Sequence, residues 1–118
     1  MADLKASVPK ELQDRVLQVV EKAAKDRKVR VGVNEVTKMI ERGQAKFVVV
    51  AQDVSPQEIV LHLPVLCKEK NVPFGMVSTK KQLGEKAGLK VGASAVVVLD
   101  EGESKKDLES LSKRFAEL

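Results

Sequence analysis

Aromatic residues and cysteine are both scarce in this sequence of 118 residues. It holds three Phe and neither Trp nor Tyr, so we expect a core built from Val, Leu, Ile and Ala. The single cysteine, Cys67, excludes an internal disulfide and fits a reducing compartment. Because Cys67 falls on the apolar stripe of a predicted helix, we interpret it as a buried structural thiol.

Long apolar runs are also absent. The longest ones, over 47–51 and 95–99, are far shorter than the roughly 20 residues that a membrane-spanning helix needs. The first residues, MADLKASVPKEL, carry no apolar signal segment. We therefore expect a cytoplasmic protein without a membrane partner.

Residues for catalysis are few. His62 is the only histidine, and five positions separate it from Cys67, which sets the two side chains about 140° apart on one helix. Side chains so placed do not form a nucleophile–base pair, and one Cys with one His cannot complete a zinc site. Neither a Walker-type phosphate loop nor a GxGxxG turn is present. We expect no enzyme activity, no cofactor, no metal and no small-molecule substrate.

Helical and strand-like segments alternate along the chain. Short runs rich in β-branched residues predict strands over 29–31, 47–51, 73–77 and 95–99, and helical periodicity predicts helices over 9–28, 34–42, 55–67, 79–87 and 104–118. This order predicts an α/β fold, a three-layer α/β/α sandwich with a mixed, central four-stranded sheet. With no repeat or linker, residues 1–118 are assigned to one domain.

Several residues mark where helices should begin, bend or end. Ser55 with Pro56 and, later, Ser104 are typical N-terminal caps, whereas Pro64 should kink the helix that contains it. Residues 79–82 have the form of a capping box, and Gly88 should close the short helix that follows.

Positive charge is concentrated in two segments, although the net charge is only +4. Residues 22–46 hold eight Lys or Arg and three acidic residues, and residues 68–90 hold six and two. The part from Asp100 onward is net acidic. The two basic segments would suit one surface for a polyanion, or two separate solvated faces, and charge alone does not decide between these.

The predicted helix that ends before Gly43 has two distinct faces. Apolar residues lie on one side (Val33, Val36, Met39 and Ile40), and polar residues lie on the other (Asn34, Glu35, Lys38 and Arg42). The plain interpretation is an amphipathic helix with a solvated face.

The beginning of this helix favours nucleic-acid recognition instead. Asn34 follows Gly32 at the helix start, where backbone N–H groups lack helical partners. Lys38 shares an edge with Asn34 and offers a charged donor to guanine O6 and N7, while Glu35 accepts from base N–H groups. Donors and acceptors mixed in this way are typical of base reading rather than of phosphate binding alone.

Residues 30–74, which begin RVGVNEVTKMIERG, and residues 78–98, STKKQLGEKAGLKVGASAVVV, together resemble the kink-turn-binding ribosomal protein family. The segments are similar to those of the archaeal large-subunit type, the L-seven-Ae proteins. The resemblance implies an α/β/α sandwich that grips a sharp bend in RNA with tandem sheared G·A pairs. It implies a structural, non-catalytic role, and separately we expect a monomer. Its RNA partners would be large-subunit ribosomal RNA, box C/D and H/ACA guide RNAs and, in some members, ribonuclease P RNA, with other ribonucleoprotein proteins reached through the RNA.

The resemblance also assigns roles to residues. Asn34, Glu35 and Lys38 would meet the G·A bases, and Gly32 and Val33 would bring backbone close to the RNA, with Arg42 on the same polar face. A nucleotide flipped out of the stack would be surrounded by Ile59, Lys80, Leu89 and Val91, and Lys90 would lie in the loop that tunes affinity and specificity. Independently, aliphatic residues beside a basic segment suit packing on an unstacked base, since Tyr and Trp are absent.

The sequence departs from the family pattern at four positions. Ser55 and Gln52 stand where acidic residues are common, and Gly75 and Met76 replace aromatic or branched residues. Ser55 leaves the polar contact of the nucleotide pocket undefined, and Gly75 should weaken its strand locally.

Two alternatives stay open. One is a related ribosomal or regulatory RNA-binding protein with the same fold and a different RNA target. The other is a small α/β enzyme or ligand-binding domain, for which the sequence offers no convergent acid, base or nucleophile.

Overall fold

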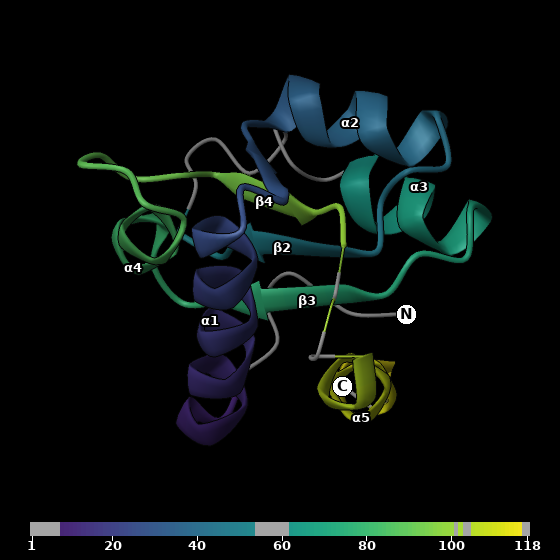
Figure 1. Cartoon of the computed structure of the whole chain (residues 1–118). Helices are drawn as coiled ribbons and strands as arrows, with labels where there is room; N and C mark the ends of the chain where they lie inside the picture. Colours follow the sequence, from purple (N-terminus) through teal and green to yellow (C-terminus); the bar gives the residue numbers. More distant parts are fainter. Residues whose placement is uncertain (1–7, 54–61, 101, 103–104, 117–118) are drawn as a thin grey trace.

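The computed structural model describes residues 8–53, 62–100, 102 and 105–116. Its sheet has four strands in the order β1-β4-β2-β3 (Figure 1). The strands are β1 (Val29–Val31), β2 (Phe47–Ala51), β3 (Phe74–Val77) and β4 (Ala95–Val98). β2 pairs with β3 in parallel, whereas β4 is antiparallel to both β1 and β2. The mixed four-stranded sheet is therefore confirmed.

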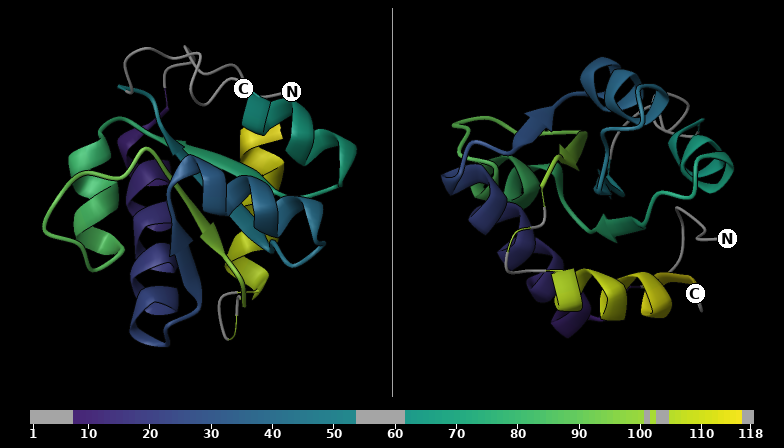
Figure 2. Two further views of the ribbon diagram at one scale, coloured as in Figure 1. Left: turned by 90° about the horizontal axis from the view of Figure 1, so that it is seen from above. Right: turned by 45° about the vertical axis from the view of Figure 1, so that its right-hand side comes forward.

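Helices cover both faces of this sheet. On one face lie α2 (Val33–Glu41) and α3 (His62–Glu69), and on the other lie α1 (Lys10–Lys25) and α5 (Lys105–Ala116), with α4 (Lys80–Lys86) beside α1 (Figure 1 and Figure 2). Every residue of β2 and of β4 is buried, as expected of strands covered on both sides. The three-layer α/β/α sandwich is confirmed. No helix in the described part of the chain has the length and apolar character needed to span a membrane.

The strand directions bring several chain segments to one edge of the sheet. β1, β2 and β3 run the same way and β4 runs against them, so the ends of the first three strands meet the beginning of β4. Val31 lies opposite Val96, and Ala51 lies opposite Val77. Four chain segments therefore lie at the same edge of the sheet: those that follow β1, β2 and β3, and the one that precedes β4.

Several helix bounds differ by one to three residues from the prediction. α1 ends at Lys25 rather than near Lys28, because Arg27 adopts a left-handed φ of 58° and the Lys28 N–H donates to the Ala23 carbonyl at 2.8 Å. This closure turns the chain directly into β1. α2 begins at Val33, one residue earlier than predicted, and the glycine after it, Gly43, has a φ of +71°.

Gly75, which we expected to weaken its strand, has a packing role instead. It is buried and pairs with Val49 in the parallel ladder. A Cβ atom at this position would lie 2.8 Å from Cζ of Phe47 and 3.2 Å from Cε2 of Phe115. Glycine thus leaves the space that two aromatic rings occupy between β3, β2 and α5.

Some predicted features lie outside the described residues: the helix start at Ser55 and Pro56, the cap at Ser104, and Ile59. α3 runs from His62 to Glu69 and includes Pro64. The predicted kink at Pro64 depends on residues before His62, which lie outside the described residues.

Candidate nucleic-acid interface

Gly32 makes the connection between β1 and α2 a single residue. Its φ of +102° and ψ of 147° belong to a backbone region that only glycine adopts without strain. The Gly32 N–H donates to the Ala95 carbonyl at 2.9 Å, and the Gly32 carbonyl accepts from the Val36 N–H at 2.9 Å. The first turn of α2 is thereby fixed against the start of β4, without a side-chain cap on its N–H groups.

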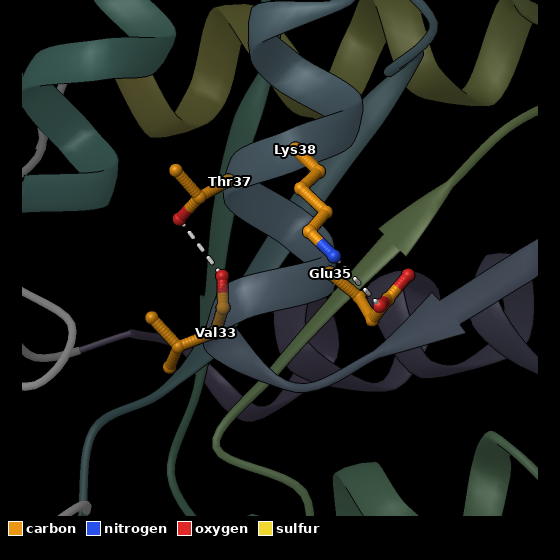
Figure 3. Close-up of polar contacts among 4 residues, drawn as sticks. All are labelled: Val33, Glu35, Thr37 and Lys38. Carbon is orange, nitrogen blue, oxygen red and sulfur yellow. Dashed lines mark hydrogen bonds and ion pairs between the residues drawn. The ribbon is translucent and has the colours of Figure 1, made fainter.

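The polar face of α2 is exposed where the sequence predicted it. Asn34, Lys38 and Arg42 are exposed, whereas Val36 and Ile40 on the other face are fully buried. The side chains of Glu35 and Lys38 are 45% and 57% exposed, and their Oε1 and Nζ atoms lie 3.8 Å apart (Figure 3). An exposed ion pair of this kind contributes little to stability, so either partner is free to exchange it for another contact.

A shallow concavity of about 790 Å³ adjoins the start of α2. It is lined by residues from the end of β1, the turn at Gly32, α2, α3 and the end of the loop before β4: Val31, Gly32, Val33, Asn34, Glu35, His62 and Ser94. Four of these were predicted site residues, namely Gly32, Val33, Asn34 and Glu35. Sequence reasoning missed Val31, His62 and Ser94.

His62 is connected to α2 through Thr37. The Thr37 hydroxyl donates to the Val33 carbonyl at 2.8 Å, and its oxygen lies 3.0 Å from Nε2 of His62. Since a hydroxyl has one proton, a donating Thr37 requires that the His62 Nε2–H donate to it. Figure 3 shows Thr37 pointing away from the Glu35–Lys38 pair. His62 thus ties α3 to the first turn of α2.

Cys67 belongs to the core and not to this site. It is 1% exposed, and burial raises the pKa of the Cys67 thiol to about 12. A thiol with such a pKa holds its proton at neutral pH, and the interpretation of a structural cysteine is confirmed. Among the described residues, no group of three or more His, Cys, Asp or Glu side chains is placed to hold a metal ion.

A second part of the site is formed by the start of α4. Thr79 caps this helix, since its Oγ1 accepts from the Gln82 N–H at 3.3 Å, which is one of the two bonds of the predicted capping box. The Gln82 Oε1 accepts from the Thr79 hydroxyl at 3.2 Å. The Lys80 N–H donates to Oδ1 of Asp53 at 2.8 Å, and the Lys80 carbonyl accepts from the Ala93 N–H at 2.9 Å. The exposed Lys80 is therefore fixed by its backbone to the end of β2 and to the loop before β4.

The loop that follows α4 presents the predicted aliphatic residues. Gly88 ends the helix with a φ of +87°, and the Leu89 N–H donates to the Gly84 carbonyl at 2.9 Å. Gly84 has no room for a side chain, because a Cβ there would overlap the Val91 carbonyl. Val91 is 70% exposed and Lys90 is exposed, whereas Leu89 packs partly against the core.

Short backbone connections join this loop to α2. The Ala93 N–H is hydrogen-bonded to the Lys80 carbonyl, and the Ala95 carbonyl accepts a hydrogen bond from the Gly32 N–H. Ser94, between them, lines the concavity. The predicted site residues on α2 and those around α4 therefore occupy the same edge of the sheet. Ile59 lies outside the described residues.

The fold matches that of a known RNA-binding protein. A solved structure of the Giardia lamblia 15.5kD RNA binding protein superimposes with a TM-score of 0.89 at 27% sequence identity, over 96% of this chain and 94% of that chain. The sequence also matches the Ribosomal protein L7Ae/L30e/S12e/Gadd45 family over residues 14–108. The chain belongs to this family and has its RNA-binding fold, so the resemblance seen in the sequence is confirmed.

Proposed function

We propose that this protein binds kink-turn RNA and stabilises its bent form without catalysing a reaction. The observation that carries the proposal is the set of exposed polar groups on one face of α2. The Asn34 amide and the Glu35 carboxylate in its first turn line an open concavity, and the Lys38 ammonium from its last turn lies 3.8 Å from Glu35. A mixture of donors and acceptors suits the edges of purine bases better than it suits phosphates.

Sheared G·A pairs are the target that these groups fit. The Lys38 ammonium donates to guanine acceptors, the Asn34 amide both donates and accepts, and the Glu35 carboxylate accepts from base N–H groups. The glycine turn at Gly32 has nothing within 4 Å of where a side chain would be, so a backbone of RNA can approach Gly32 and Val33 closely. Arg42, one turn beyond Lys38, is proposed to contact phosphate.

The loop after α4 supplies the second contact. We assign to Val91, with Leu89 and Ile59, the packing on a nucleotide that leaves the stack, and to Lys80 and Lys90 the contacts with its phosphates. The 70% exposure of Val91 supports this role, because an aliphatic side chain held above the surface can cover an unstacked base.

The mechanism is a shift of a conformational equilibrium. Free kink-turn RNA samples open and bent forms, and a protein that binds only the bent form raises its population. The RNAs proposed as targets are large-subunit ribosomal RNA, box C/D and H/ACA guide RNAs and ribonuclease P RNA, in a cytoplasmic protein that acts as a monomer. Other ribonucleoprotein proteins would be reached through the RNA.

The test compares two RNAs that differ only in the motif. One RNA carries a three-nucleotide bulge followed by tandem G·A pairs. In the other RNA, Watson–Crick pairs replace the G·A pairs. Isothermal titration should show at least a hundredfold preference for the first, since several base contacts of about 1–3 kcal/mol are lost together. Equal affinity for both RNAs would refute kink-turn recognition and leave a different RNA target on the same fold.

A further inference from the structure

Asp53 is an exposed carboxylate at the proposed RNA-binding edge with no role assigned so far. It follows β2, and its Oδ1 accepts the backbone N–H of Lys80 at 2.8 Å, across a sequence separation of 27 residues. The bond is to the peptide nitrogen of Lys80, while the ammonium lies at the other end of that long side chain. A carboxylate repels phosphates, so its presence here needs a structural reason.

The bond from Asp53 continues into the loop that carries Val91. The Lys80 carbonyl accepts from the Ala93 N–H at 2.9 Å. Gly92 lies so close that a Cβ on it would be 3.0 Å from Cγ of Lys80. The backbone of Lys80 is thus held by β2 on one side and holds the loop on the other.

Thr79 does not make Asp53 redundant. The Thr79 hydroxyl satisfies the N–H of Gln82, whereas Asp53 satisfies the N–H of Lys80, two residues earlier in the helix. Each acceptor therefore serves its own N–H group at the start of α4.

We infer that Asp53 is a positioning residue for RNA recognition: through the peptide of Lys80 it fixes Lys80 and the loop 89–92 in the arrangement that receives the unstacked nucleotide. This inference rests on the proposed function. It requires no contact between Asp53 and the RNA.

The test uses the full chain with Asp53→Ala, which removes the acceptor, and Asp53→Asn, which keeps a neutral acceptor. Glu109→Gln is the charge control, because Glu109 is an exposed carboxylate on α5, across the sheet from α2. Should Asp53→Ala fail to fold, Asp53→Ser takes its place, since the serine hydroxyl is one bond too short to reach Lys80.

The first measurement needs no RNA. Amide hydrogen exchange followed by NMR should become about three- to tenfold faster at Lys80 and Ala93 in Asp53→Ala, as expected when one hydrogen bond is lost, and stay near wild type in Asp53→Asn. Unchanged exchange at both amides in Asp53→Ala would overturn the inference, whether or not the protein binds kink-turn RNA.

The second measurement uses two kink-turn RNAs, one intact and one with an abasic site at the unstacked nucleotide. Asp53→Ala should bind the intact RNA about three- to tenfold more weakly than wild type, and Asp53→Asn should match Glu109→Gln. With the abasic RNA, wild type and Asp53→Ala should bind alike. If wild type binds and Asp53→Ala shows no loss, or shows the same loss with both RNAs, the positioning role is refuted while the proposed function stands. If wild type does not bind, the proposed function fails. The exchange measurement is then the test of whether Asp53 holds Lys80 and the loop 89–92 in place.

Discussion

At the scale of single residues, Asn34 and Lys38 are the sharpest test of base reading. Both are exposed on α2, so neither supports the core, and a loss of affinity would report on contacts with RNA. We expect Asn34→Ala or Lys38→Ala to cost about 1–3 kcal/mol in the free energy of kink-turn binding, the usual size of a lost base contact. Isothermal titration with the intact RNA measures this cost.

Matched controls for these variants lie on other helices. Gln18→Ala on α1 removes an exposed amide, and Lys113→Ala on α5 removes an exposed ammonium, both from helices on the other side of the sheet. They should bind as wild type does. Unchanged affinity in both α2 variants would contradict their role in base recognition.

Cys67 makes the stability of the fold depend on pH in the alkaline range. Its pKa is raised by burial from 9.0 to about 12 in the folded protein. Below pH 9 both the folded and the unfolded thiol keep the proton. Above it only the unfolded thiol ionises, so the free energy of unfolding falls by about 1.4 kcal/mol per pH unit.

Urea unfolding of wild type and Cys67→Ala between about pH 8 and pH 10.5 checks this prediction, because lysine titration is common to both proteins and cancels in the difference. The difference in unfolding free energy should stay constant up to about pH 9 and then change in favour of Cys67→Ala. Parallel curves over the whole range would show that the folded thiol ionises normally.

At the scale of elements, the contact between β3 and the two phenylalanines explains a glycine that looked unfavourable in the sequence. Gly75→Ala would press a methyl group against the rings of Phe47 and Phe115. We expect a loss of about 1–3 kcal/mol in the free energy of unfolding from overpacking. Denaturant unfolding measures it.

A double-mutant cycle identifies the cause. Phe47→Leu removes the ring atom nearest to Gly75, so Gly75→Ala should cost less in that background than in wild type. If the two losses simply add, the crowding is not with Phe47, and contact with Phe115 or a change in the strand itself causes the loss.

The elements themselves were largely predictable, because their signals are local. Runs such as FVVVA predict buried strands, and the spacing of Val36, Met39 and Ile40 predicts which face of α2 is buried. The end of α1 was misplaced by about three residues, since the left-handed turn at Arg27 has no glycine to mark it.

The site was predictable only in part, because some of its contacts join residues that are far apart in the sequence. The exposed face of α2 follows from helical periodicity, but the bond between Thr37 and His62 joins residues 25 positions apart, and that between Asp53 and Lys80 joins residues 27 apart. Such contacts depend on how strands and helices are ordered in space. The solitary His62 and the acidic residue after β2 were visible in the sequence, yet their partners were not.

At the scale of the whole molecule, the direction of the strands places the proposed RNA contacts on one side and leaves α5 on another. Lys38 is exposed on α2 and Lys80 is exposed at the start of α4, whereas Lys106 and Lys113 are exposed on α5, which lies across the sheet from α2 (Figure 1). The net charge of +4 is too small to bind RNA strongly by itself, so the distribution of the lysines should decide the salt dependence.

Each lysine that neutralises a phosphate releases counterions, and the logarithm of the binding constant should therefore fall linearly with the logarithm of the salt concentration. Removing one such contact should reduce this slope by about 0.7–0.9. We expect that reduction in Lys80→Ala and Lys90→Ala, whereas Lys106→Ala and Lys113→Ala, which lower the net charge equally, should leave the slope unchanged. Titrations at several potassium chloride concentrations measure it. Equal reductions in all four variants would mean that RNA binding depends on the total charge of the protein. Such a result would contradict the proposal that RNA binds at the edge formed by α2, α4 and the loop before β4.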